Sequence, residues 1–359
     1  MASGAPNARR QGSALGLVLA ATVIVGCAGS TPGAEMVPPM PLALSAAAAP
    51  PGFPTGGVAS TAPADSPLTE ARAQLGRSLF YDRRLSRTAE IACASCHQQK
   101  FAFADSVAVS AGVEGRHGTR NAPALVNLAW NSTFFWDGRA RSLEEQAGMP
   151  IENPVEMDLS LADAVVRLNA DVASVSAFTA AFDQPPSAET LRQALASFVR
   201  TLVSGDSPYD RHLRGDDSAF GDSQRHGEAL FFSDRTACFH CHPAGELTND
   251  GLFNNGSYTE GGDPGRQMVT GLPGDLGKFK VPGLRNVAAS APYMHDGSVP
   301  TLQAVIDQYA RGGRGHPSTD PQIAPLSLTD GEKADLLAFL RALTDDGFLS
   351  DGRFAEPAR

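Results

Sequence analysis

The stretch Cys-Ala-Ser-Cys-His at residues 93–97 decides the fold, and Cys-Phe-His-Cys-His at residues 238–242 repeats its pattern in a chain with five cysteines. In a helical turn, residues i, i+3 and i+4 share one face, so the two thiols and the imidazole of each motif can meet one flat ligand. The thiols would bond the vinyl groups of a porphyrin, and the histidine would bind its iron. We therefore predict two covalently bound c-type haems, attached through Cys93, Cys96, Cys238 and Cys241 and ligated by His97 and His242.

Other uses of a Cys-x-x-Cys pair fit these motifs less well. A thioredoxin-type redox pair would leave the histidine that follows both copies unexplained. A zinc site needs four ligands brought together, whereas each motif supplies three that are already committed to one face. Disulfides would suit an exported protein, but a bridge across two residues would stabilise it little.

The N-terminus predicts export. Arg9 and Arg10 precede an apolar run from Ala14 to Val25 that ends in Gly-Cys at position 27. We expect residues 1–27 to be a lipoprotein-type signal peptide, with Cys27 acylated, a periplasmic location and membrane contact through the lipid alone. A simple signal cleaved at a small-residue site is the alternative. Residues 28–67, rich in Ala, Pro, Gly and Ser, predict a flexible tether.

Length and charge limit the remaining possibilities. A chain of 359 residues with 42% hydrophobic content can form about two domains with cores of their own, hence one haem in each. The formal net charge of -10 argues against nucleic acid and permits a basic protein partner.

The pattern between the motifs predicts an all-α fold of two cytochrome c-like domains with long loops. A weak internal repeat, Gly-Arg-Ser-Leu-Phe at residues 76–80 and Gly-Glu-Ala-Leu-Phe at residues 227–231, precedes the two motifs, and alternating strand patterns are almost absent. Further helix signals are Ser142-x-x-Glu145, the run Ala188 to Val203, and Thr329-x-x-Glu332. Residues 243–283, rich in Gly, Asn and Asp, predict a loop around a cofactor. We expect domains at 68–205, completed by the C-terminal segment, and 206–345, with a tail at 346–359.

A second axial ligand would decide how each haem behaves. Tyr309 lies on the apolar face of a predicted helix over residues 301–309, and Met294 lies nearby in sequence. A phenolate would favour the oxidised states of iron, whereas a Met ligand would raise the potential. Either residue is a candidate ligand, and a packed core Tyr is the alternative.

Several further stretches resemble the bacterial di-haem cytochrome c peroxidase and MauG superfamily, from about Leu68 to Leu343. They occur in the order that the family has them, between and after the two haem motifs. The stretches are Phe135-Trp136-Asp-Gly-Arg139-Ala-Arg-Ser-Leu-Glu-Glu-Gln146, Pro154-Val-Glu156-Met157, Val281-Pro-Gly-Leu-Arg285-Asn-Val and Ala291-Pro292-Tyr-Met294-His295-Asp-Gly.

The resemblance implies a role for each matching residue. His97 would ligate the peroxide-reactive haem and His242 the electron-transfer haem. Glu156 matches a distal carboxylate that moves a proton between the peroxide oxygens. The resemblance also implies a distal hydrogen-bonding Gln146, an electron-relaying Trp136 between the haems, and a calcium site formed by Asn121 with the carbonyls of Ser290 and Pro292.

Two departures from the peroxidases point to the MauG-like branch. Where the peroxidases have a loop His that caps the resting haem, this chain has Val113, although His117 could substitute after a loop rearrangement. Where the peroxidases place an axial Met, this chain has Tyr309, as MauG-like enzymes do.

These features predict an exported di-haem peroxidase that reduces hydrogen peroxide to water, with electrons from a small cytochrome c or cupredoxin. The alternative is a MauG-like enzyme that uses peroxide to oxidise residues of a partner protein. A simple di-haem electron carrier is the third hypothesis, and it would have no use for Glu156 and Gln146.

Overall fold

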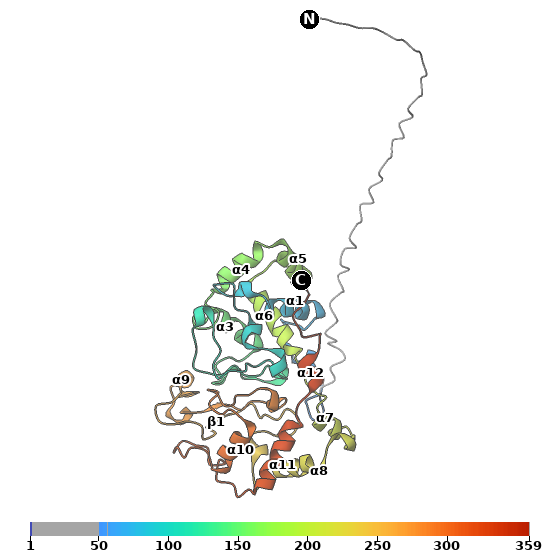
Figure 1. Cartoon of the computed structure of the whole chain (residues 1–359). Coiled ribbons are helices and arrows are strands. Elements are labelled where there is room, and N and C mark those ends of the chain that lie inside the picture. The colour runs from blue at the N-terminus through green and yellow to red at the C-terminus, as the bar shows by residue number, and fades with distance from the viewer. Residues whose placement is uncertain (2–49, 56, 359) are drawn as a thin grey trace, which may run out of the picture. The chain divides into compact units, whose positions relative to one another are not determined.

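The computed structural model describes residues 1, 50–55 and 57–358 of the chain (Figure 1). The predicted signal peptide beyond Met1, with Cys27, and residues 28–49 of the predicted tether lie outside this range. Within it, no helix has both the length and the apolar character needed to cross a membrane. Export and lipid anchoring therefore stay predictions.

The described residues form a mostly helical fold, which confirms the predicted all-α class. The α-helices are α1 Glu70–Phe80, α2 Cys93–Cys96, α3 Leu143–Glu152, α4 Leu161–Asn169, α5 Val172–Phe182, α6 Ala188–Arg200, α7 Pro208–Leu213, α8 Asp222–Phe231, α9 Gln267–Thr270, α10 Leu302–Ala310, α11 Asp330–Arg341 and α12 Asp346–Ser350. Short 3₁₀ helices are η1 Val58–Thr61, η2 Arg83–Leu85, η3 Gln99–Phe101, η4 Val113–Gly115, η5 Leu128–Trp130, η6 Asp217–Ala219, η7 Cys238–His240, η8 Pro273–Asp275 and η9 Val287–Ala289. The strands β1 Leu252–Phe253 and β2 Phe279–Lys280 pair antiparallel, so the predicted loop at 243–283 contains a small ribbon.

Helix starts follow the capping signals in the sequence. Thr329 and Glu332 form a complete capping box at the start of α11. At α3 the Ser142 hydroxyl accepts a hydrogen bond from the Glu145 amide at 3.1 Å, while the Glu145 carboxylate accepts from the Arg141 amide instead. Each cap satisfies backbone N–H groups that have no partner inside the helix, and its loss typically costs about 1 kcal/mol.

The internal repeat corresponds to one helix crossing that occurs twice. Helix α1 packs on α6 in the first hydrophobic core, and α8 packs on α11 in the second. At each crossing a glycine lets two backbones approach closely. A Cβ on Gly76 would overlap the Ala194 carbonyl and lie 2.9 Å from Phe198 Cβ, and a Cβ on Gly227 would overlap the Asp335 carbonyl and lie 2.8 Å from Phe339 Cβ.

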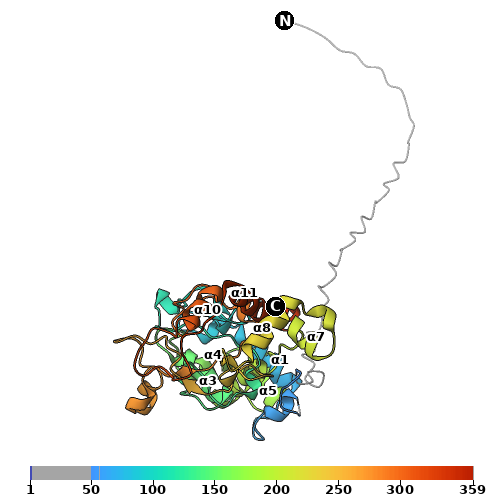
Figure 2. The same ribbon diagram turned by 90° about the horizontal axis from the view of Figure 1, so that it is seen from below.

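The two cores lie in different halves of the described body. Figure 1 shows α1 and α3 to α6 gathered in one half and α8, α10 and α11 in the other. Figure 2 shows the C-terminal helices from below. The C-terminal segment returns to the first core, where Phe348 and Phe354 are both 4% exposed. The predicted tail at 346–359 thus includes two side chains that pack in the first core.

Part of the predicted flexible tether is also packed. Phe53 is buried and meets Trp130 edge-on with ring centroids 4.7 Å apart, and Val58 is buried as well. These two apolar side chains lie in an otherwise small and polar stretch and pack on the folded body. The flexibility of the predicted tether stays a prediction.

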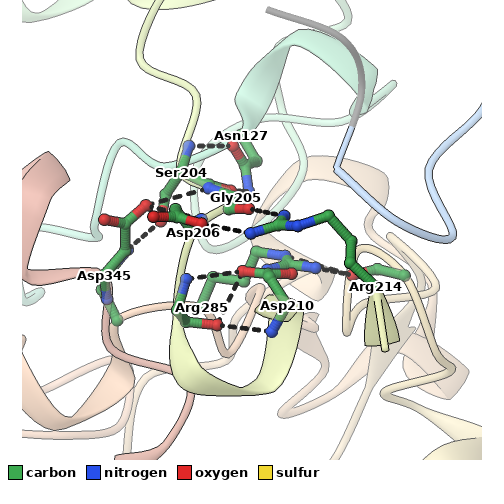
Figure 3. A network of polar contacts seen from close by, with 11 residues as sticks. Asn127, Ser204, Gly205, Asp206, Asp210, Arg214, Arg285 and Asp345 are labelled. Carbon is green, nitrogen blue, oxygen red and sulfur yellow. Dashed lines mark hydrogen bonds and ion pairs between the residues drawn. The ribbon is translucent and has the colours of Figure 1, made fainter. Parts of the chain in front are cut away.

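A buried polar junction joins the halves where the chain leaves α6 (Figure 3). Asp345 Oδ2 accepts hydrogen bonds from Ser204 Oγ at 3.2 Å, from the Gly205 amide at 3.1 Å and from the Asp206 amide at 3.0 Å. Close by, Arg285 and Asp210 form an ion pair at 2.6 Å whose side chains are 2% and 0% exposed. The junction holds the connection between the two cores in one arrangement.

Candidate active site

One cavity of about 830 Å³ is lined by residues of both Cys-x-x-Cys-His motifs. Its walls come from both halves of the body. They include the predicted site residues Cys96, His97, Asn121, Trp136, Gln146, Glu156, Cys238, Cys241, His242, Ser290, Pro292, Met294 and Tyr309. Cys93 packs against the first hydrophobic core. The fold therefore brings together residues that are widely separated in the sequence.

The first motif fits a covalently bound haem. Cys93 and Cys96 lie on the single turn of α2, and both are free thiols. The His97 Nδ1 lies 2.7 Å from the Phe103 carbonyl oxygen. Because a carbonyl only accepts, Nδ1 carries the proton and Nε2 keeps its lone pair for a metal. Burial lowers the pKa of His97, which keeps the ring neutral as a metal ligand needs.

The second motif has the same construction. Cys238 begins the one-turn η7, Cys241 follows it, and both thiols are free. The His242 Nδ1 donates to the Leu247 carbonyl at 2.8 Å, so its Nε2 is also available to a metal. Burial, with a smaller contribution from the Lys280 charge, lowers the pKa of His242 to about 4. The helical turn predicted for each motif is confirmed.

Glu156 lies in the cavity wall on the turn that follows α3. The Asn153 Nδ2 donates to Glu156 Oε1 at 2.6 Å, and Asn153 Oδ1 in turn accepts from the Val155 amide at 3.2 Å. Burial raises the pKa of Glu156, while the Asn153 hydrogen bond acts in the opposite direction. The carboxyl is thus placed to exchange a proton with a ligand in the cavity. Gln146, on α3 itself, lines the same cavity.

The loop beside Glu156 is held by backbone contacts. The Val113 amide donates to the Glu156 carbonyl at 2.8 Å, and the Val113 side chain is 0% exposed. A Cβ on Gly112 would overlap the Glu156 backbone, so only glycine fits there. His117 is exposed, with its Nδ1 3.1 Å from the Ser110 carbonyl. Surface ion pairs join Arg87, Glu114, Arg116 and Asp158 around this loop.

Trp136 is fixed from both halves of the body. Its indole Nε1 donates to the Asn121 carbonyl at 2.8 Å, and its own carbonyl accepts from the Lys280 amide at 2.7 Å. The ring lines the cavity together with His97 and His242. An aromatic ring in that position can serve electron exchange between groups bound at the two histidines.

Tyr309 and Met294 meet at one amide side chain. The Asn255 Nδ2 donates to Tyr309 Oη at 3.0 Å and lies 3.5 Å from Met294 Sδ. The orientation of this amide is fixed because its Oδ1 accepts from the Ser257 amide at 3.1 Å. The Ser257 hydroxyl donates to the same sulfur at 3.3 Å. Both candidate ligands are therefore held by this amide: Tyr309 Oη accepts one hydrogen bond and Met294 Sδ accepts two.

Asn255 and Lys280 are site residues that the sequence analysis missed. Asn255 lies in a Gly- and Asn-rich stretch where nothing distinguishes one amide from the next. Lys280 did carry a signal, since it is a single charge between the apolar residues Phe279 and Val281.

The residues of the predicted calcium site also line the cavity. The Asn121 Nδ2 donates to the carbonyls of Val107 and Ala108 at 3.1 and 3.2 Å. The amide oxygen of Asn121 is not used by these bonds. Together with the carbonyls of Ser290 and Pro292 it offers the kind of oxygen group that calcium prefers. Among the described residues no group of three or more His, Cys, Asp or Glu could hold a metal ion. A cation here would therefore depend on amide and carbonyl oxygens.

Comparisons with known proteins cover both motifs. A family model described as di-haem cytochrome c peroxidase matches residues 70–218, and one described as RoxA-like, cytochrome c-like, matches residues 278–314. The methylamine utilization protein MauG of Methylorubrum extorquens is 40% identical over 288 residues, 78% of this chain and 80% of that protein. Cytochrome c551 peroxidase of Pseudomonas aeruginosa is 35% identical over 288 residues, 77% of this chain and 80% of that protein. The crystal structure of a MauG-like protein associated with microbial copper homeostasis has a TM-score of 0.79 and 38% identity, with 83% of this chain and 96% of that chain covered.

Proposed function

The chain belongs to the family of di-haem cytochrome c peroxidases and MauG proteins, and we propose that it is an exported peroxidase that reduces hydrogen peroxide to water at the His97 haem. The observation that carries the proposal is a carboxyl group, Glu156, in the wall of the cavity that His97 lines. The haem supplies the iron at which one peroxide, two electrons and two protons give two water molecules. The protein has to supply the proton transfer and the electron path.

Glu156 is the proton-transfer residue in this proposal. A general base accepts the proton of one peroxide oxygen, and the same group as an acid delivers it to the other oxygen. Burial raises the pKa of Glu156 toward the range in which both forms are populated. The Asn153 amide, 2.6 Å away, keeps the carboxyl aimed in one direction. Gln146 offers a hydrogen-bonding group on the same wall.

Trp136 and the His242 haem form the electron path in this proposal. The indole lines the cavity that both proximal histidines share and donates to the Asn121 carbonyl, while the Trp136 backbone carbonyl accepts from the Lys280 amide. A fixed aromatic ring shortens the gap over which each electron must pass.

A MauG-like reaction, with electrons taken from residues of a partner protein, is the second candidate. Two observations favour it. Tyr309, with its hydroxyl held by Asn255, is the candidate axial ligand at the second haem. At the first haem, Val113 occupies the loop position of the capping His, and His117 is exposed on the surface. The loop supports a first haem that is open without prior reduction, and Tyr309 supports a second haem that can store an oxidising equivalent.

The location and the calcium ion are further parts of the proposal. The Arg-Arg pair, the apolar run and Cys27 support export to the periplasm and a lipid anchor, and covalent c-type haem attachment agrees with export. The oxygen groups of Asn121, Ser290 and Pro292 support one calcium ion between the halves.

The proposal is tested by mixing the fully ferric protein with stoichiometric hydrogen peroxide in stopped flow. We expect a fast change of the haem spectrum in the wild type, and a rate lower by roughly 10²-fold or more in Glu156→Gln with both haems still attached. An unchanged rate in Glu156→Gln would show that Glu156 does not transfer the proton. Reaction only after one haem is reduced would contradict the open first haem and favour a gated cytochrome c peroxidase.

A further inference from the structure

A buried ion pair lies beside the second haem motif and has no assigned role. The Lys280 ammonium lies 2.8 Å from Asp250 Oδ1, and the two side chains are 10% and 17% exposed. The ammonium also donates to the Val281 carbonyl at 3.3 Å. No other described residue donates a hydrogen bond to that oxygen of Asp250, so its charge is balanced by Lys280. Placing two charges here costs desolvation energy, and apolar side chains of similar volume would avoid that cost.

The carboxylate of this pair reaches across to the first half of the molecule. Asp250 Oδ2 accepts hydrogen bonds from the Ser132 amide at 2.6 Å, the Ser132 hydroxyl at 2.7 Å and the Thr133 amide at 3.0 Å. These donors precede the Trp136 segment in the chain. Asp250 is thereby held in place by groups outside the second half, and it holds the ammonium in turn.

Lys280 links the Trp136 segment of the first half to the cavity that His242 of the second half also lines. The backbone amide of Lys280 donates to the Trp136 carbonyl at 2.7 Å, and Lys280 lines the cavity together with Trp136 and His242. Its charge is also felt at the His242 ring, although burial is the larger cause of the lowered pKa of His242. A positive charge near a haem favours the reduced iron, which carries one positive charge less. The charge is little screened by solvent because it is buried.

We propose that the Lys280–Asp250 pair raises the reduction potential of the haem at His242, and so sets how readily that haem accepts an electron through Trp136. In this role Lys280 is a positioning residue, because it acts through its charge and its place and does not touch the reacting atoms. The energetic cost of the buried pair is then explained by redox function. The proposal rests on the two-haem assignment of the proposed function but not on its peroxide chemistry.

The test is a redox titration of the purified holoprotein in the absence of peroxide, followed by the haem absorbance. Lys280→Gln keeps a hydrogen-bonding group for Asp250 but removes the charge, and Lys280→Arg keeps the charge. We expect Lys280→Gln to lower the potential of the second haem by at least a tenfold change in its reduction equilibrium, about 59 mV for one electron. Lys280→Arg should stay close to the wild type.

A matched control lies in the same half of the protein. Lys333 pairs with Asp307 at 2.9 Å, and these side chains are 23% and 35% exposed, so water screens them. Lys333→Gln should leave both potentials unchanged. Equal potentials in Lys280→Gln and Lys333→Gln, or equal shifts in Lys280→Gln and Lys280→Arg, would overturn the proposal. If Lys280→Gln does not take up haem, Lys280→Met also removes the charge, and the same titration should show a lowered potential of the second haem.

The outcomes separate this inference from the proposed function. A lowered potential in Lys280→Gln together with a wild-type protein that is inert to peroxide would support the ion pair and refute the peroxidase. Peroxide activity of the wild type together with an unshifted potential in Lys280→Gln would support the peroxidase and refute the role of the ion pair.

Discussion

Replacing Asn153 with alanine should move the pH dependence of the peroxide reaction to higher pH. The Asn153 Nδ2 donates to Glu156 Oε1 at 2.6 Å. This hydrogen bond is the largest effect that opposes burial, because it lowers the pKa of Glu156 where burial raises it. A hydrogen bond to a charged group is worth about 1.5–3 kcal/mol. This hydrogen bond stabilises the carboxylate form, so its loss should raise the pKa of Glu156 further.

Partial solvent access of the carboxyl reduces the size of this effect but not its direction. The carboxylate form accepts the first proton from peroxide, so the rate increases as pH rises through the pKa of Glu156. In Asn153→Ala the midpoint of this increase should lie at higher pH, with the rate at high pH little changed. Stopped-flow rates of the ferric protein with peroxide, measured from acidic to alkaline pH, give this midpoint directly.

Asn169→Ala is the matched control, because the Asn169 side chain donates only to the carbonyls of Val165 and Pro186. Its rate profile should coincide with that of the wild type. A midpoint in Asn153→Ala that stays in place or moves to lower pH would refute the role of Asn153. A profile in Glu156→Gln that keeps its rise with pH would show that another group accepts the proton.

Three further predictions concern other parts of the molecule. Tyr309→Phe removes the phenol oxygen, so the ferric absorbance spectrum of the second haem should change, while an unchanged spectrum would mean that Tyr309 is not a ligand. Trp136→Phe should slow electron exchange between the haems at least about tenfold in flash-reduction kinetics, with haem content unchanged. Gly227→Ala forces a methyl group into the α8–α11 crossing and should lower the free energy of unfolding, measured with denaturant, by about 1–3 kcal/mol. Gly274→Ala is its control: open space surrounds the added Cβ, so the loss should be under about 0.5 kcal/mol.

The two motifs and the helical class could be predicted from the sequence because their signals are local. A Cys-x-x-Cys-His motif places three ligands on one turn, and the structure has that turn at residues 93–97 and 238–242. The caps at Ser142 and Thr329 are likewise decided by a few neighbouring residues. The repeat at Gly76 and Gly227 was visible as well, but its meaning, a close crossing with a second helix, needed the partners Ala194 and Asp335.

The missed features all depend on residues that are distant in the sequence. Asn255 is one amide among several in its loop until Tyr309 and Met294 are seen at its Nδ2. The Lys280–Asp250 pair needs Ser132 and Thr133 to explain why the carboxylate is held. Local composition likewise gives no sign that Phe53 packs on Trp130, because the two rings meet only in the folded chain.

The return of the C-terminal segment to the first core governs the order of assembly. Phe348 and Phe354 complete the hydrophobic core that contains α1 and α6, and Arg77 donates to the Ala355 carbonyl at 2.7 Å. The half of the chain that is synthesised first is therefore finished last. Until Phe348 and Phe354 pack, the core that carries the first motif is incomplete. A chain shortened after Asp345 would lose the closing step of the half that carries His97.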